Sequence, residues 1–321
     1  MTPSPQSYIG IDASKAELEV AVGQIIAGRF ENTLSGMQRL LKRLPGPSEV
    51  AMVIIESTGC YSQLAARTLT TAGYRVAVVQ PGRIRHYARS QGQLAKTDQI
   101  DARIIAQFGE HTPGLHIYQE PSATRQRLRA LIDRRDQVVE DRVREDNRLE
   151  ACQDDRVRTQ LRTSIARLRK QADALENNIL ALIASDKELA GLYAVVESMK
   201  GIGSITAATL LAHLPELGRV NRQEIAALAG VAPYNNDSGA HRGTKSIYGG
   251  RQRVRNAMHM AAVCAVRCDD ACASFFHALR ERGKPTKVAL VAVVRKMLIR
   301  LNSVVAAYRQ QQAAAAQPTP T

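Results

Sequence analysis

The stretch YIGIDASKAELEVAV, residues 8–22, sets the start of the fold. Two short runs of apolar and β-branched residues, 8–12 and 18–22, flank a polar turn, and the first run ends at the carboxylate of Asp12. Runs of this length and composition, separated by a polar turn, predict β-strands. The sequence therefore begins with two short strands, the first of which ends in an acid.

The strand signature recurs further along the chain. Residues 51–55 are continuously apolar and are followed by Glu56, and residues 74–79 repeat the pattern. Residues 61–72, between these two runs, have helical spacing. Strands that alternate with a helix of about a dozen residues are typical of α/β domains. We therefore predict an α/β domain over residues 1–114.

Long helices are predicted next, because residues 122–185 contain neither Gly nor Pro and are rich in Arg, Asp, Glu, Leu and Ala. Steps of four and three residues form a coiled-coil seam of about three heptads, made of Leu161, Ile165, Leu168, Ala172, Leu175, Ile179 and Leu182. Its partner is either the upstream helix or a second subunit. We predict a coiled-coil segment for linkage or oligomerisation at 115–190, an all-α C-terminal domain at 191–310 and a disordered tail at 311–321.

The chain is strongly basic. It has 321 residues, with 44 Lys and Arg against 30 Asp and Glu, a formal net charge of +14 and a pI near 9.9. Residues 239–300 contain 13 Lys and Arg against 3 Asp and Glu. Positive charge concentrated in one region favours the phosphates of nucleic acid as a partner, and a surface that only maintains solubility is the alternative.

Whole-chain disorder is excluded by a hydrophobic content of 45% over this length. Every long apolar run is interrupted by Arg or Lys before the ~18 residues that a membrane-spanning helix needs. The first residues contain no secretory signal pattern. We therefore expect a cytoplasmic protein that does not enter a membrane.

Four carboxylates form the first candidate site. Asp12 and Glu56 follow predicted strands, while Asp98 and Asp101 lie three residues apart in a segment of helical spacing and so share one helix face. Oxygen ligands that converge from strands and a helix suit two Mg²⁺ ions flanking a scissile phosphodiester, which predicts phosphoryl transfer. Lys96 would then position a phosphate oxygen. Taken singly, each acid fits a helix cap, a turn or a solvated surface position better.

A glycine turn between two helical patterns forms a second candidate. Gly201 and Gly203 bracket one apolar residue in the segment MKGIGSITAATLL. The pattern is typical of a helix-hairpin-helix, whose backbone amides can approach the phosphates of a duplex closely. A simple connector between packed helices is the equally favoured alternative.

The third candidate is Ser238, in a segment rich in glycine and arginine. A serine that attacks a phosphodiester needs an exposed hydroxyl and nearby guanidinium groups to offset the developing charge. This segment supplies the cations Arg242, Lys245, Arg251, Arg253 and Arg255. His241 is a candidate base or phosphate donor, and an ordinary polar loop residue is the favoured alternative for it. Considered alone, the serine is more often a turn residue.

Together, the motifs YIGIDASK, IIESTGCY, AKTDQIDARIIA, the GIG turn and AALAGVAPYNNDSGAHRGTKSIYGGR resemble the IS110 family of insertion-sequence transposases, also called bridge-RNA-guided recombinases. The resemblance covers residues 8–302 and is closest to the IS1111 branch. It implies an RNase H/RuvC-like N-terminal domain with DEDD carboxylates at Asp12, Glu56, Asp98 and Asp101, which would bind Mg²⁺.

The resemblance also implies that Ser238 is the nucleophile and holds a phosphoserine link to DNA during strand exchange through a Holliday junction. Family members act as dimers and tetramers in which the carboxylates of one subunit and the serine of another form a composite site. A structured noncoding guide RNA would pair with donor and target DNA. The expected setting is the bacterial cytoplasm, in association with the nucleoid.

We therefore expect the transposase of an insertion sequence, which exchanges DNA strands under RNA guidance. One alternative is a RuvC-like nuclease that hydrolyses branched DNA with water as the nucleophile and is indifferent to Ser238. The other is a basic RNA- or DNA-binding protein without catalysis, whose binding is salt-sensitive and unaffected by Mg²⁺.

Overall fold

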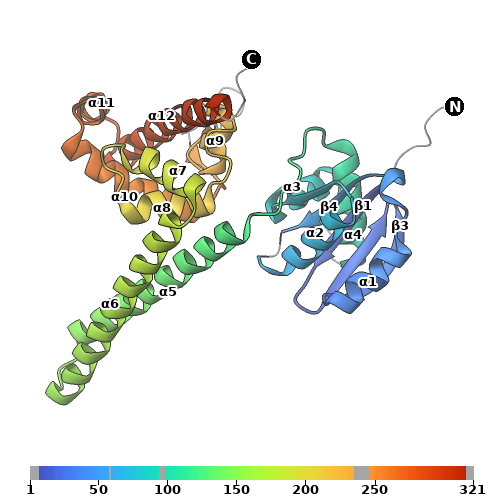
Figure 1. Ribbon diagram of the computed structural model, residues 1–321, viewed down its shortest axis with the longest axis horizontal. Helices are drawn as coiled ribbons and strands as arrows, with labels where there is room; N and C mark the ends of the chain where they lie inside the picture. The colour runs from blue at the N-terminus through green and yellow to red at the C-terminus, as the bar shows by residue number, and fades with distance from the viewer. Residues whose placement is uncertain (1–6, 58, 94–97, 235–245, 316–321) are drawn as a thin grey trace. The chain divides into compact units, whose positions relative to one another are not determined.

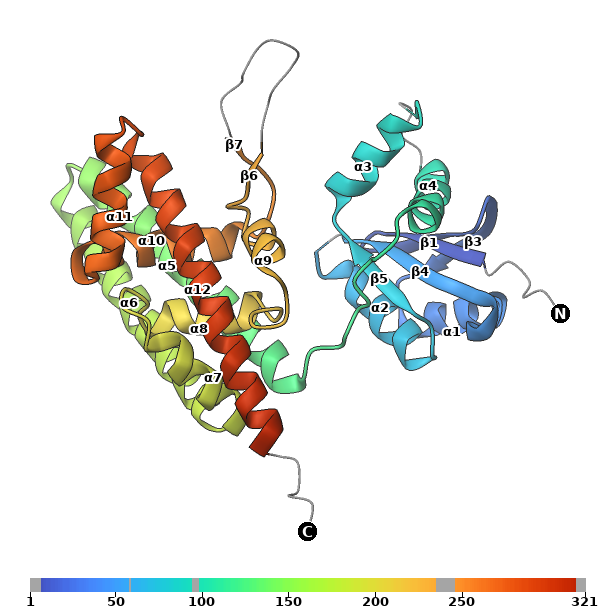
Figure 2. The same ribbon diagram turned by 90° about the horizontal axis from the view of Figure 1, so that it is seen from above.

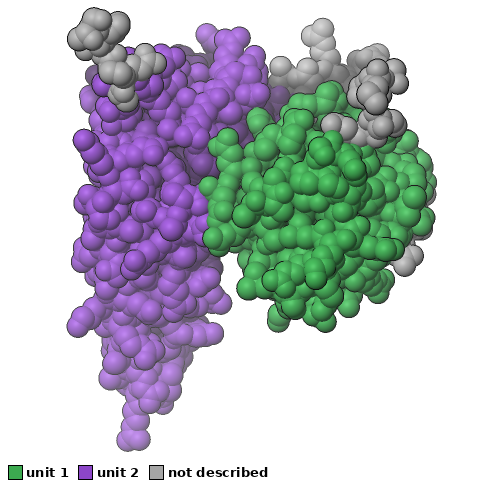
Figure 3. All heavy atoms as spheres, turned by 45° about the vertical axis from the view of Figure 1, so that its right-hand side comes forward, with its two compact units in different colours: residues 1–120 green, residues 121–321 purple. Residues whose placement is uncertain are grey.

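The computed structural model describes residues 7–57, 59–93, 98–234 and 246–315, except for the side chains of residues 98–101. The chain divides into two compact units, coloured separately in Figure 3: unit 1, Met1–Glu120, and unit 2, Pro121–Thr321. Across the described residues, no helix is both long and apolar enough to span a membrane.

Unit 1 is built on a five-stranded sheet of order β3-β2-β1-β4-β5. Neighbouring strands are antiparallel from β3 to β1 and parallel from β1 to β5. Their bounds are β1 (Ser7–Ala13), β2 (Glu17–Val22), β3 (Ile25–Glu31), β4 (Val50–Glu56) and β5 (Val76–Val79). Four of the five confirm strands predicted from the sequence. The edge strand β3 was not predicted, although the two residues that join it to β2 include Gly23 at φ +56°, which is typical of a hairpin turn.

Helices cover both faces of this sheet, as Figure 2 shows. On one face, α1 (Leu34–Arg43) and α2 (Tyr61–Thr71) pack onto the side chains of Ile9, Ile11, Val53 and Ile55. On the other face, α3 (Pro81–Ser90) and α4 (Asp98–His111) share a core with Ile54, Ala77 and Val79. A 3₁₀ turn at Pro47–Glu49 leads into β4. Unit 1 is therefore a three-layer α/β domain, as predicted.

The second face depends on a close approach between α4 and β1 at Gly10. An added Cβ at Gly10 would lie 2.1 Å from the carbonyl oxygen of Ala102 and 2.4 Å from the amide nitrogen of Ala106. Further along the helix, a Cβ at Gly109 would lie 2.1 Å from Ile54 Cδ1. The backbone of α4 therefore rests directly on the sheet, which only glycine at these two contacts allows.

Unit 2 begins with a helical hairpin of α5 (Ala123–Ala151) and α6 (Asp155–Ala184), which extends from the rest of the unit in Figure 1. The upstream helix is thus a partner of α6 within the same chain. Arg135 on α5 donates from Nε and Nη2 to Glu176 Oε1 on α6, at 2.9 and 2.7 Å. Along the predicted seam, Ile165, Ala172 and Ile179 are buried, while the four leucines are half-buried. A supercoiled seam stays a prediction.

The rest of unit 2 is a helical bundle that shares one apolar core with the base of the hairpin. Its elements are α7 (Lys187–Glu197), α8 (Ser204–His213), α9 (Arg222–Leu228), β6 (Pro233–Tyr234), β7 (Ser246–Ile247), α10 (Gln252–Cys268), α11 (Asp270–Glu281) and α12 (Thr286–Ala315). Buried Asn302 on α12 accepts a bond from the amide of Gly218 at 2.8 Å and donates to the carbonyl of Val220 at 2.7 Å. This one side chain fixes the loop between α8 and α9.

Two expectations for the C-terminal part need correction. The predicted all-helical region contains the two-stranded ribbon β6–β7. The predicted tail at 311–321 is helical through Ala315, because a run of alanines has the highest helix propensity and continues α12. The finer division into segments 115–190 and 191–310 stays a prediction, since residues 115–120 belong to unit 1 and residues 121–310 all belong to unit 2.

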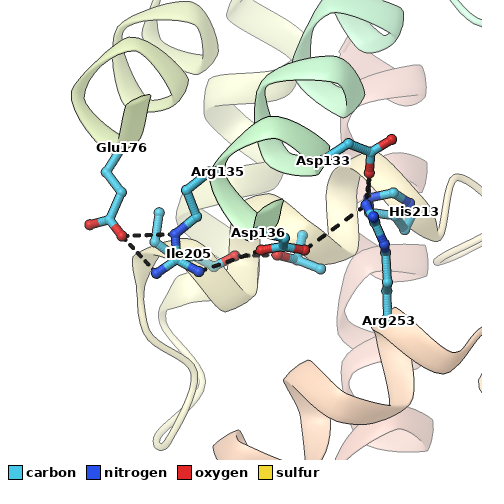
Figure 4. Close-up of polar contacts among 8 residues, drawn as sticks. Asp133, Arg135, Asp136, Glu176, Ile205, His213 and Arg253 are labelled. Atoms are coloured by element: carbon cyan, nitrogen blue, oxygen red, sulfur yellow. Dashed lines mark hydrogen bonds and ion pairs between the residues drawn. The ribbon is translucent and has the colours of Figure 1, made fainter. Parts of the chain in front are cut away.

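A polar network connects α5, α8 and α10 in unit 2 (Figure 4). His213, at the end of α8, is 8% exposed, and its Nε2 lies 3.2 Å from Asp133 Oδ1 on α5. Burial, assisted by the charge of Arg129, lowers the pKa of His213 to about 4. The ring is therefore neutral at pH 7. The positive charge opposite Asp133 comes instead from the guanidinium of Arg253 on α10.

Replacing Gly10 by Ala should separate α4 from the sheet, since backbone atoms leave no space for the added methyl group. We expect a loss of roughly 1–3 kcal/mol in the local opening free energy of β1 and α4. Hydrogen exchange of the full chain measures it by peptide. Gly82→Ala is the matched control, because nothing lies within 4 Å of a Cβ added there. Unchanged protection of α4 in Gly10→Ala would contradict the close approach.

Candidate active site

Asp12 and Glu56 occupy matching positions on two neighbouring parallel strands. Ile11 on β1 pairs with Ile55 on β4, and the two acids are the next residue of each strand. Because side chains alternate between faces, both acids point to the face opposite these isoleucines, which is the face covered by α4. Both residues are half-buried. The sheet thus brings the first two predicted carboxylates together.

The first turn of α4 lies at the same end of β1. Gly109 lies beside Tyr8, and Ala102 and Ala106 lie beside Gly10, so α4 runs antiparallel to β1. Asp98 lies four residues before Ala102, which is about 6 Å along the helix axis. Asp12 lies two residues after Gly10, which is about 6.6 Å along the strand. The helix therefore begins level with Asp12.

That first turn contains Asp98 and Asp101, whose backbones belong to α4 and whose side chains lie outside the described residues. Lys96 also lies outside them. In the part of the chain that the structure describes, no three His, Cys, Asp or Glu side chains gather in a group that could hold a metal ion. The fit to a divalent cation therefore rests on the donors themselves. Asp12 and Glu56 carry hard oxygen donors of the kind that Mg²⁺ prefers, at the carboxyl ends of β1 and β4, next to a helix turn with two more acids.

The described residues on the two sides of the serine segment meet at a narrow glycine neck, Gly230 and Gly250. Ser238, Arg242 and Lys245 lie outside the described residues, but both ends of the segment are described, as the antiparallel ribbon β6–β7. Below the ribbon, a Cβ at Gly250 would lie 2.1 Å from the amide nitrogen of Gly230. Both glycines have φ near +69°. The two ends of the segment are therefore held at backbone contact.

Three of the arginines predicted to contact nucleic acid have partners within the protein, around this neck. Arg251 forms a fork with Glu216, at 2.5 and 2.6 Å, and also donates to the carbonyl of His213 at 3.1 Å. Arg255 donates to the carbonyl of Gly249 at 2.7 Å. Arg253 pairs with Asp133 in the polar network. These contacts stabilise the base of the serine segment, and phosphate contact by the same three residues stays a prediction.

The GIG turn is confirmed as a tight connection between two helices, α7 and α8. Gly201 has φ +91°, and a Cβ there would lie 2.7 Å from both the carbonyl oxygen of Ala261 and the Cβ of Ala265 on α10. Close packing against α10 thus explains this glycine. Gly203 precedes α8 as its N-cap, with open space around its Cα. A phosphate contact at this turn stays a prediction for Gly203 above all.

Sequence reasoning missed the partners of these residues. Asp133, His213 and Glu216 lie in three separate elements, 35 or more residues from the arginines that they contact. No spacing rule connects residues so far apart. The sequence does indicate a turn at Gly230, because this glycine follows an apolar helical run in the segment AALAGVAP and glycine commonly ends helices.

Comparison with known proteins gives two family matches, mainly on different units. Residues 9–155 match a model described as a transposase, for the DEDD domain of IS110 elements. Residues 193–277 match the transposase family IS116/IS110/IS902. The first match contains Asp12, Glu56 and all of α4, and the second contains the GIG turn and the serine segment.

Similar proteins agree with these matches. The chain is 27% identical over 305 residues to the pilin gene-inverting protein of Moraxella bovis, covering 91% of this chain and 94% of that protein. It is 28% identical, over the same shares, to the pilin gene-inverting protein of Moraxella lacunata. It is also 31% identical over 140 residues to an uncharacterised 43.6 kDa protein of the insertion element IS110 from Streptomyces coelicolor, covering 43% of this chain and 34% of that protein.

The two family matches lie in the order that the motifs predicted. The first match contains the sheet with the neighbouring acids Asp12 and Glu56. The second match lies in the helical bundle and contains the glycine neck. The chain therefore belongs to the IS110 family of transposases, enzymes that rearrange DNA.

Proposed function

We propose that this chain is the recombinase of an insertion sequence and exchanges DNA strands through a covalent phosphoserine link at Ser238, with Mg²⁺ held by Asp12, Glu56, Asp98 and Asp101. The observation that supports this most is the register of β1 and β4. It brings Asp12 and Glu56 side by side, at the end of the sheet where α4 begins.

The proposed chemistry is a transesterification at one DNA phosphodiester. The Ser238 hydroxyl oxygen attacks phosphorus, and the bond from phosphorus to one deoxyribose oxygen breaks. The hydroxyl proton passes to a base, and the leaving oxygen takes up a proton to become a free strand end. Bound Mg²⁺ would supply charge stabilisation of the attacking and leaving oxygens. Attack on the phosphoserine by the hydroxyl of another strand then restores a phosphodiester and frees the serine.

The neck beneath Ser238 supports a role for this segment. Arg255 donates to the carbonyls of Gly249 and Gly230, which lie on the two sides of the segment, and Arg251 joins its C-terminal side to Glu216. The serine segment therefore starts from a fixed base. A fixed base limits the conformational entropy that is lost when the segment binds a substrate.

RNA guidance, a dimer or tetramer and a place at the bacterial nucleoid complete the proposal. These three features follow from the family resemblance. The Moraxella relatives support strand exchange, because their name describes the inversion of a pilin gene. Sequence readout by base pairing would leave the protein to bind backbone phosphates. This division fits a chain with a formal charge of +14 and few aromatic residues.

Glu56→Gln tests the carboxylate site, with Glu17→Gln as its matched control on an exposed position of β2. We expect Glu56→Gln to lower Mg²⁺-dependent DNA cleavage by at least about a hundredfold, since an amide binds the cation far more weakly. Mn²⁺ binding, followed by electron paramagnetic resonance, should weaken in parallel. Glu17→Gln should behave as wild type. Cleavage by Glu56→Gln within a few-fold of wild type would remove Glu56 from the site.

Ser238→Ala tests the nucleophile, with Ser246→Ala on β7 as the control. We expect Ser238→Ala to abolish the covalent adduct between protein and DNA, measured by denaturing electrophoresis of a labelled strand, because no other group restores the Ser238 oxygen. Ser246→Ala should retain the adduct. An adduct of normal yield from Ser238→Ala contradicts the proposal, and cleavage without any adduct in wild type favours the hydrolytic alternative.

RNA guidance has a direct test. The chain is expressed together with its native flanking DNA and purified through a high-salt wash, and the bound RNA is sequenced. We expect one discrete RNA from the flank, since a structured partner survives a wash that removes contacts made only to phosphates. Heterogeneous RNA, or none, would contradict guidance and leave strand exchange to be tested by the Ser238 adduct.

A further inference from the structure

The connection between Glu56 and Asp98 has an unusual charge. Residues 57–97 contain six Arg and Lys and not one Asp or Glu, in a chain with 30 acids overall. This segment links β4 to the first turn of α4, so it joins two of the proposed metal ligands. Among its described elements, α3 has the densest charge, with Arg83, Arg85 and Arg89 within ten residues.

Helix α3 starts at the same edge of the sheet as the carboxylates. Glu56 pairs with Val79 at the end of β5, and α3 begins at Pro81, two residues later. The helix then packs beside α4, as Figures 1 and 2 both show. Its position is therefore set by the strand that borders the proposed site.

One side of α3 faces the protein. Ile84 is 3% exposed and belongs to the core with Phe108 of α4. Tyr87 packs edge-on against the Phe108 ring and its hydroxyl lies 2.8 Å from His111 Nδ1. The guanidinium of Arg83 lies 5.2 Å from the centre of the same phenyl ring. These contacts fix the rotation of α3 about its axis.

The opposite side of α3 presents Arg85 and Arg89 to solvent. They are four residues apart, so they share one face, and helical spacing places that face away from Ile84 and Tyr87. Like charges at this spacing destabilise a helix by a few tenths of a kcal/mol. Within the described residues, no carboxylate pairs with either one. The helix therefore holds two repelling cations that an anion from outside would relieve.

Other arginines of unit 1 show the contrast. Arg29 pairs with buried Glu19 at 2.5 Å, Arg39 pairs with Glu31 at 3.1 Å, and Arg67 finds Glu120 at 2.8 Å, outside the acid-free segment. Arginines with internal partners thus occur on β3, α1 and α2. The two on the outer face of α3 are the ones placed beside the carboxylate edge.

We propose that the outer face of α3, through Arg85 and Arg89, binds the sugar-phosphate backbone of duplex DNA next to the carboxylate site. This inference rests on the proposed function, since it names how unit 1 holds the strand that reacts there. Four acids at one edge repel a polyanion, and a cationic helix next to them offsets that repulsion. Phosphate contacts fix position and carry no sequence information, as RNA-guided readout requires.

The test is binding of the full chain, without Mg²⁺, to a fluorescent duplex DNA of arbitrary sequence over a series of salt concentrations. Each lost phosphate contact lowers the slope of log affinity against log salt by about 0.9, so Arg85→Gln/Arg89→Gln should lower it by about 2. Affinity at low salt should fall by on the order of tenfold or more. Arg85→Lys/Arg89→Lys should retain the wild-type slope.

The matched control is Lys42→Gln/Arg43→Gln, which removes two exposed cations from α1 on the other face of the sheet. Its slope should stay near wild type. Hydrogen exchange of α3 and α4 checks that the variants are folded. An equal slope for both double variants overturns the proposal, and so does a loss confined to a duplex RNA probe. This experiment measures binding and not catalysis. A negative result for the Ser238 adduct and a negative result for the α3 surface can therefore be distinguished.

Discussion

The contact of α4 with β1 at Gly10 is the constraint on which unit 1 depends. A helix whose backbone touches a strand, with the nearest carbonyl 2.1 Å from where a Cβ would be, has its direction and its depth fixed together. The strands β1 and β4 position Asp12 and Glu56, and Asp98 and Asp101 lie in the first turn of α4. Their common location is therefore a consequence of one close approach and one register, Ile11 with Ile55.

Unit 2 depends on a different close approach, at the neck below β6 and β7. Gly230 and Gly250 meet at backbone distance, and Arg251 joins the neck to Glu216. Buried polar groups of this kind are costly unless they are paired, and the neutral ring of His213 leaves Arg253 as the partner of Asp133. Arginines that the sequence predicts as nucleic-acid contacts thus also stabilise the described residues around the neck.

Charge is distributed accordingly across the described chain. Among the described arginines, Arg251 at the neck, Arg29 on β3, Arg39 on α1 and Arg67 on α2 pair with acids of the protein, whereas the connection between Glu56 and Asp98 itself contains no acid. Net charge alone therefore overstates how many cations face a partner. The cations without acids of their own are the better guide to where a polyanion lies, because only they gain from its approach.

The sequence by itself determined the strands that contain Asp12 and Glu56, the helical segment of Asp98 and Asp101, the long helices after residue 122 and, through ordered motifs, the family. Each of these depends on residues within about a dozen positions, where periodicity carries the signal. Only the tertiary structure decided that Gly10 supports α4, that Gly201 packs on α10, and that Arg251 belongs to Glu216. Such contacts join positions 35 to 96 residues apart, and their energies depend on distances that no local pattern encodes.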